Sequence, residues 1–133
     1  MSSPDELLAA AKIICEIAEK KESEAMYRAA INRLYFSSYH QCRNYHIGLS
    51  RPGSVGSANG KHQQLLAQLS NPDAKLPDED RMKSVVAGKE LRMILGKRVD
   101  ADYNCRKEIS LGDMRLSIQA ADSIFANTQH PSA

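Results

Sequence analysis

Arg33 and His40 are the two side chains of this sequence whose types and spacing best suit chemistry on a phosphate. They are seven residues apart, so on a helix they point the same way, about 10 Å apart along its axis. Arginine can hold a phosphodiester by a forked pair of hydrogen bonds, and histidine can take or give a proton near neutral pH. The alternative is structural, with Arg33 in an ion pair and His40 as a partly buried, hydrogen-bonded histidine. Residue types alone favour this alternative.

The segment around this pair is basic and contains no acid. Residues 25–72 have five bases and no carboxylate, a charge of +5, whereas residues 1–24 have a charge of −3 and residues 73–133 are neutral. The segment also holds three of the four histidines and five of the seven aromatic residues. Such a region attracts phosphate-bearing partners, unless its bases pair with acids from elsewhere in the fold. The five bases are Arg28, Arg33, Arg43, Arg51 and Lys61.

A second cluster with chemical potential contains Arg98, Asp102 and Tyr103. Arg98 and Asp102 are four residues apart, a spacing that allows a helix-surface ion pair worth ~0.3–0.5 kcal/mol. Alternatively, Asp102 neutralises Arg33 across the fold, and the spacing does not decide between these arrangements. We predict the pair between Arg33 and Asp102 inside the protein, where losing one partner of a buried ion pair typically costs ~3–5 kcal/mol.

Metal and cofactor sites are not expected. His40 and His46 diverge by about 120° around a helix, and their segment lacks carboxylates. Cys15, Cys42 and Cys105 are odd in number and widely spaced, so each is expected to be a buried small apolar residue in a reducing cytoplasm. No apolar run approaches the ~20 residues of a membrane span, and the acidic N-terminus does not resemble a secretory signal.

Five helices in one all-α domain, residues 1–133, are expected to position these residues. Periodicity and breakers predict an up-and-down helical bundle of four main helices plus one short helix. The helices are expected at 4–21, from 23 to about 45 or 46, at 61–70, from after residue 80 to Gly96 or beyond Arg98, and from Ser110 onward. Ser3, Ser23 and Ser110 are expected N-caps, the last in a capping box with Asp113. A flexible loop is expected at 47–60 and a frayed tail at 127–133.

The helical periodicity also predicts a core. The second helix should bury one face of apolar and tyrosine residues, and a polar stripe of Arg33, Ser37, His40 and Asn44 should lie beside it. The expected core residues are Tyr27, Ile31, Leu34, Tyr35, Ser38, Cys42 and Tyr45 in the second helix, Met82, Val85, Val86, Met93 and Ile94 in the fourth, and Leu111, Met114, Ile118, Ala121 and Phe125 in the last.

Two segments together resemble the HEPN family of helical domains. Residues 27–40, with the sequence YRAAINRLYFSSYH, look like the second-helix signature of that family. Residues 91–98 followed by Ala101, Asp102 and Tyr103 look like its Arg-x-x-Ala-Asp-Tyr segment. Gly60, Lys61 and His62 are similar to members with a histidine after the loop. The resemblance covers about residues 23–125.

The resemblance implies a homodimeric bundle with its functional groove at the two-fold interface. Many members are RNA-associated, as metal-independent endoribonucleases of toxin–antitoxin, defence or RNA-processing systems, and others accompany a nucleotidyltransferase. Their ribonuclease motif has four to six residues between an arginine and a histidine. It generally lies late in the bundle, where this chain has Tyr103 in place of the histidine. Arg33 and His40, with six residues between them, match the spacing on an earlier helix.

We therefore expect a cytoplasmic homodimer that binds or cleaves RNA or a nucleotide, with an antitoxin or a nucleotidyltransferase as a possible protein partner. The alternatives are a catalytically silent interaction module, which Tyr103 favours, and a nucleotide-binding module whose 47–60 loop closes Arg51 over a phosphate. The expected catalytic residues are His40, Arg33 and Arg98; the expected phosphate ligands are Arg43, His46, Arg51, Lys61 and His62; and the expected supporting residues are Asp102, Tyr103, Ser37 and Asn44.

Overall fold

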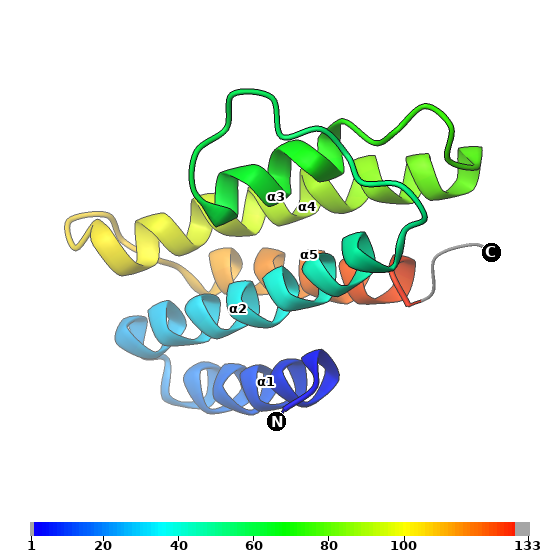
Figure 1. Cartoon of the computed structure of the whole chain (residues 1–133). Helices are drawn as coiled ribbons and strands as arrows, with labels where there is room; N and C mark the ends of the chain where they lie inside the picture. The colour runs from blue at the N-terminus through cyan, green and yellow to red at the C-terminus, as the bar shows by residue number, and fades with distance from the viewer. Residues whose placement is uncertain (1, 130–133) are drawn as a thin grey trace.

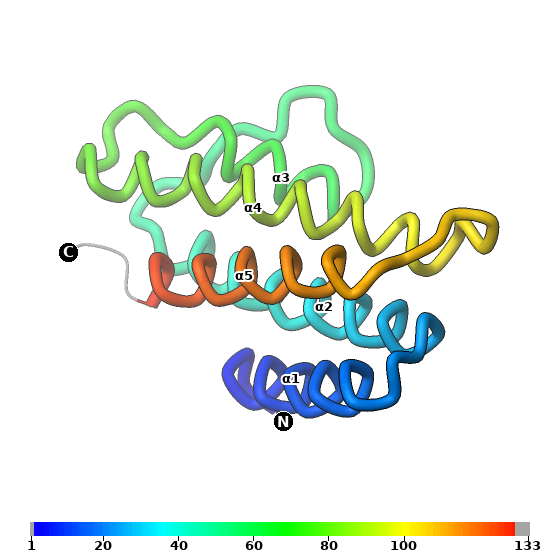
Figure 2. The backbone as a smooth tube through the Cα atoms, turned by 180° about the vertical axis from the view of Figure 1, so that it is seen from behind, coloured from blue at the N-terminus to red at the C-terminus, as the bar shows by residue number. Residues whose placement is uncertain are grey.

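The computed structural model describes residues 2–129, which form five α-helices and no strand. The helices are α1 (Pro4–Lys21), α2 (Glu24–Gly48), α3 (Lys61–Ser70), α4 (Asp78–Tyr103) and α5 (Leu111–Asn127). The four long helices alternate in direction, and the short α3 packs along α4, on the side away from α1 (Figures 1 and 2). The predicted all-helical architecture is confirmed.

Local capping determines most of the helix starts. Ser3 forms a capping box with Glu6, and Ser110 forms one with Asp113. Ser23 accepts a hydrogen bond from the amide of Met26. The three predicted N-caps are therefore confirmed. Each accepts from an amide of the first turn, where no carbonyl four residues earlier lies within the helix.

Two helices extend beyond their predicted bounds. Helix α2 continues to Gly48, two residues beyond His46. Helix α4 begins at Asp78 rather than after residue 80, so that its acids lie at the positive end of the helix dipole. At its other end it continues through Gly96 to Tyr103, the longer of the two predicted extents, so Arg98 lies on the helix rather than in a loop.

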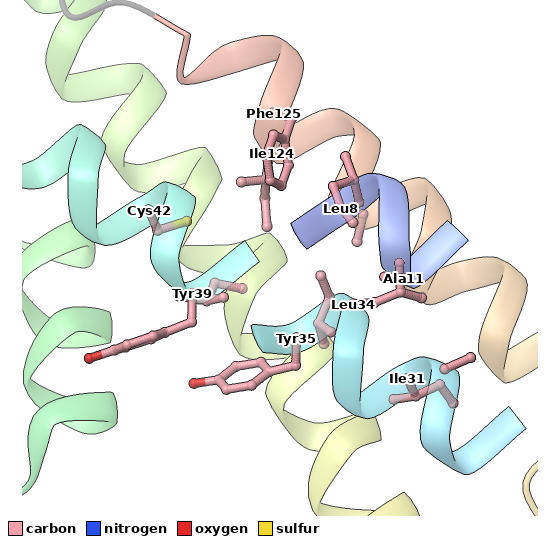
Figure 3. Packing of buried hydrophobic residues seen from close by; sticks show 14 of the residues in the cluster. Leu8, Ala11, Ile31, Leu34, Tyr35, Tyr39, Cys42, Ile124 and Phe125 are labelled. Atoms are coloured by element: carbon pink, nitrogen blue, oxygen red, sulfur yellow. The ribbon is translucent and has the colours of Figure 1, made fainter. Parts of the chain in front are cut away.

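Helix α2 is the central helix, because it packs against each of the other four. Its predicted core face is confirmed, and all seven of its members are buried. Figure 3 shows that the hydroxyl ends of Tyr35 and Tyr39 point to the same side, away from Leu34 and Ile124. The aromatic part of the core therefore ends in polar groups on the side where α3 lies.

The predicted core face of α4 was wrong at three of its five residues, whereas Ile94 is buried and Val85 is half-buried. Met82, Val86 and Met93 are exposed, and the buried face contains the small residues Ser84, Ala87 and Gly88. A Cβ atom on Gly88 would lie 3.1 Å from Cβ of Leu69. Close approach of α3 therefore selects the small-residue face, a choice that apolar periodicity within α4 does not contain.

Arg28 of α2 stabilises the C-terminal end of α4. Its guanidinium donates hydrogen bonds to the carbonyls of Asp100, Ala101 and Asn104, at 3.2, 3.0 and 3.1 Å, and to the carbonyl of Lys107. Helix α4 has no basic residue in its own last turn. Arg28 thus supplies the donors and the positive charge that a helix C-terminus favours.

The connection from α2 to α3 is attached to the helices by specific contacts. The amide of Gly53 donates to Nε2 of His46 at 3.0 Å, and the amide of Ser54 donates to the carbonyl of Asn71 at 3.0 Å. A Cβ atom on Gly53 would lie only 2.0 Å from the carbonyl oxygen of Gln68. This position therefore requires glycine, because α3 leaves no room for a side chain.

The predicted fraying of the tail was wrong at Thr128. This residue is buried, and its carbonyl and hydroxyl oxygens each accept a hydrogen bond from Gln41 at 3.0 Å. Of the other residues in the predicted frayed tail, Asn127 is the last residue of α5, and residues 130–133 lie outside the described residues.

The prediction that all three cysteines are buried was wrong at Cys105. Cys15 and Cys42 are buried, but Cys105 is exposed in the turn between α4 and α5. Within residues 2–129, no helix is both long enough and apolar enough to cross a membrane.

Candidate functional site

A cavity of about 180 Å³ lies where α2, α3 and α4 meet. Two imidazoles, two cations and no carboxylate line it, and we call it the two-histidine cavity. Its lining residues are Asn32, Tyr35, Phe36, Tyr39 and His40 from α2, Lys61 and His62 from α3, and Arg98 from α4. Tertiary structure thus brings three of the expected site residues on α3 and α4 to the same place as His40.

Tyr39 lies between the two histidines of the cavity. Its ring centroid is 5.3 Å from that of His40 and 4.7 Å from that of His62. The two imidazoles are therefore at most 10.0 Å apart, the sum of these distances. Both imidazoles line the same cavity.

Tyr35 orients His62. Its hydroxyl oxygen lies 2.7 Å from Nδ1 of His62, within hydrogen-bonding distance. Burial raises the pKa of Tyr35 well above its usual range, so the phenol stays protonated at neutral pH. This contact occupies Nδ1 and leaves Nε2 of His62 as the ring nitrogen for a ligand.

Both cavity histidines are neutral at pH 7. Burial lowers the pKa of His40 below its usual 6.5, and the charges of Arg43 and Lys61 lower it further. Burial also lowers the pKa of His62, with added repulsion from Arg98 and then Lys61. A neutral imidazole is a proton acceptor, the state that a general base needs.

Arg98 is held by an acid and two aromatic rings. Its Nε lies 2.8 Å from Oδ2 of Asp102, in an ion pair without hydrogen-bond alignment. The guanidinium also lies 5.7 Å from the ring centre of Tyr35 and 5.4 Å from that of Tyr103. These contacts place its positive charge at the edge of the cavity.

The predicted pair between Arg33 and Asp102 was wrong. Asp102 accepts a hydrogen bond from Nδ2 of Asn32 at 2.8 Å and pairs with Arg98. One residue of an α-helix corresponds to a rotation of about 100°, so when Asn32 faces α4, Arg33 does not. Arg33 is exposed and lies over the ring of Phe36, 5.6 Å from its centre.

The other expected site residues are distributed more widely. Ser37 is fully buried and donates to the carbonyl of Leu34, so its role is structural. His46 is buried and holds Gly53. Arg51 is exposed on the loop, and Tyr103 is exposed beside Arg98. Asn44 lies in a neighbouring hollow.

Two larger hollows adjoin the two-histidine cavity and share its residues. One, of about 450 Å³, includes Tyr39, Arg43 and Lys61. The other, of about 430 Å³, includes Phe36, His40 and Arg43. No residue that lines these three spaces is acidic. We call their combined surface the α2 groove.

The chain matches no protein-family model, no curated protein and no solved structure. The function of the α2 groove is therefore argued from its own residues. Among residues 2–129, no three His, Cys, Asp or Glu side chains lie close enough together to hold a metal ion.

Sequence reasoning missed Asn32, Tyr35, Phe36 and Tyr39 as members of the site. Tyr35 was assigned to the core alone, yet its hydroxyl reaches His62, 27 residues further along the chain. Both ends of that contact are common residue types, and no local spacing connects them. A usable signal was the clustering of five aromatics in the acid-free segment.

Stability should fall in mild acid, partly because of His46. Burial lowers the pKa of His46, and its Nε2 can accept from Gly53 only when unprotonated. His46 therefore binds a proton more tightly in the unfolded chain than in the folded protein. Its contribution to the free energy of unfolding is complete above the usual pKa of 6.5 and is lost as the pH falls through the lower pKa of the folded state.

Denaturant unfolding of wild type and His46→Gln between pH 7.5 and 5 measures this contribution. Glutamine keeps an acceptor oxygen but does not titrate, so the variant should take up fewer protons on unfolding, by at most about one. Its stability should therefore vary less with pH than that of wild type. Parallel curves for the two proteins would show that His46 does not contribute to the acid sensitivity.

Proposed function

We propose that the α2 groove binds RNA and that the two-histidine cavity cleaves it without a metal ion. The observation that carries this proposal is the presence of two neutral imidazoles beside Lys61 and Arg98 in a cavity without carboxylates. A bound phosphate meets favourable charge there and no repulsion from a lining acid.

The first turn of α3 adds donors for a phosphate. Helix α3 begins at Lys61 with no side-chain cap and no acidic residue in its first turn. Amide groups at a helix N-terminus point along the axis and favour an anion. Lys61 and His62, both at this end, also line the cavity. The uncapped amides therefore lie at the same end of α3 as these two cavity residues.

The proposed reaction is an internal transfer. His40 removes the proton of the ribose 2′-hydroxyl, the 2′-oxygen bonds to phosphorus, and the bond from phosphorus to the 5′-oxygen breaks. His62, protonated when the bound phosphate offsets the charges of Arg98 and Lys61, gives its proton to the leaving 5′-oxygen. Lys61 and Arg98 stabilise the charge on the transition state. The products are a 2′,3′-cyclic phosphate and a 5′-hydroxyl.

A metal-independent endoribonuclease is the activity that the resemblance to the HEPN family implies. The role of His62 as the acid is assigned from the cavity and not from that resemblance. The cytoplasmic homodimer and a protein partner such as an antitoxin or a nucleotidyltransferase belong to the same proposal. The HEPN resemblance motivates them, and the charge of the α2 groove supports the RNA part.

A catalytically silent RNA-binding module is the second candidate. It is favoured by the environment of Arg98, which is paired with Asp102 and stacked against Tyr103, the residue that replaces the expected histidine. In this function the cavity would hold a phosphate without the proton transfers.

Incubation of end-labelled RNA with the protein in EDTA tests the proposal. Cleavage should continue and leave 2′,3′-cyclic phosphate and 5′-hydroxyl ends. Lys61→Gln should weaken binding and lower the slope of log affinity against log salt by about one, as expected for one lost phosphate contact. Salt-dependent binding without cyclic ends would identify the silent module. Absence of both binding and cleavage would refute both candidates.

A further inference from the structure

Phe36 is the one aromatic residue of α2 whose side chain is exposed. The four tyrosines of this helix are buried, whereas Phe36, which has no polar atom, is 39% exposed. The hydrophobic effect favours the opposite arrangement, because a tyrosine at the surface can keep its hydroxyl hydrated. Single exposed apolar residues are ordinary, so exposure alone does not make Phe36 part of a binding site.

Phe36 lies where two parts of the α2 groove meet. It lines both the two-histidine cavity and the adjoining hollow that contains Arg43 and Asn44. Its ring makes an edge contact with His40, with centroids 4.6 Å apart. The exposed ring is therefore in direct contact with the proposed general base.

A cation already lies against this ring. The Arg33 guanidinium is 5.6 Å from the ring centre of Phe36, and Arg33 is exposed. Such an exposed contact is weak, and stacking of a nucleobase on an aromatic ring is usually stronger. A base can therefore displace Arg33 from the ring or insert between the two side chains.

We infer that the α2 groove takes single-stranded RNA and that Phe36 is the stacking platform for an unpaired base beside the cleaved phosphodiester. This inference rests on the proposed function and specifies its substrate. Bases inside a duplex are stacked on their neighbours, so only an unpaired or extruded base can present a free face to Phe36. The cations of the groove bind the phosphate backbone of the RNA. Phe36 stacks with a nucleobase, a contact that a polyanion without bases cannot make.

Fluorescence anisotropy with three probes tests the inference. The probes are a short single-stranded RNA with 2′-O-methyl groups that prevent cleavage, the same strand in a duplex, and the single strand carrying abasic sites. Phe36→Leu should weaken binding of the first probe by roughly tenfold, equivalent to about 1.4 kcal/mol. It should leave binding of the duplex and of the abasic strand unchanged.

Two variants serve as controls. Phe36→Tyr keeps a ring that can stack and should bind the single strand as wild type does. Leu116→Ala removes a similarly exposed apolar side chain from α5 and should have no effect on binding of any probe.

The outcomes separate this inference from the proposed function. If wild type and Phe36→Leu bind the single strand equally well, or if wild type binds the abasic strand as tightly as the intact one, the platform is refuted while phosphate binding stands. If wild type binds none of the probes, the proposed function fails as well.

Discussion

Replacing His40 by alanine should slow RNA cleavage by roughly 10²- to 10⁴-fold, the usual contribution of a positioned general base. RNA binding and the melting temperature should stay close to those of wild type, because His40 is only partly buried and its contacts are ring edges with Phe36 and Tyr39. Single-turnover rates in EDTA, with the enzyme in excess over the RNA, measure the effect on the chemical step.

The pH dependence of cleavage tests the role of His40 as the base. Because burial and the charges of Arg43 and Lys61 lower its pKa, the acid limb of the rate profile should lie below pH 6.5. The rate should fall again at higher pH, where His62 loses the proton that it donates. Arg43→Gln removes one of the two repelling charges. It should therefore raise the pKa of His40 toward its usual value and move the acid limb of the profile to higher pH.

His62→Ala provides the companion measurement. If His40 and His62 act as base and acid in one step, the double variant should lose much less than the product of the two single losses. Cleavage by His40→Ala at the wild-type rate would remove the assigned role. If the rate loss of the double variant equals the product of the two single losses, the two histidines act independently.

Replacing Arg28 by alanine should destabilise the protein by about 3 kcal/mol, the upper part of the range for hydrogen bonds to a charged group. The change removes the donors for three carbonyls at the end of α4 and one in the following turn. No basic residue in the last turn of α4 can replace them. For a chain of this size the melting temperature should fall by roughly 10 °C.

Arg115→Ala is the matched control for Arg28→Ala. Arg28 pairs with Glu24, with Nε 3.2 Å from Oε1, and Arg115 likewise pairs with Glu19. Both side chains of the second pair are about half exposed, and surface ion pairs are worth only about 0–1 kcal/mol. Thermal and urea unfolding of the two variants should therefore differ clearly. A loss for Arg28→Ala no larger than that for Arg115→Ala would show that the carbonyl contacts contribute little. Arg28→Lys, with fewer donors, should be intermediate.

The local features of this protein followed from the sequence because their causes lie within a few residues of each other. The capping boxes at Ser3 and Ser110 depend on a residue three positions away. The core face of α2 follows from apolar spacing along one helix, and the basic segment from composition. These features also predicted the all-helical class and His40 as a candidate residue of the site.

Tertiary structure decided which faces meet. Asp102 pairs with Arg98 and Asn32 rather than Arg33 because Asn32 is the residue of α2 that faces α4. Helix α4 buries its small residues because α3 approaches closely at Gly88. His62 joins the cavity through Tyr35, a contact across 27 residues. Helical periodicity describes the faces that one helix offers, but the packing of all five together selects the face that is buried and the residues that form the site.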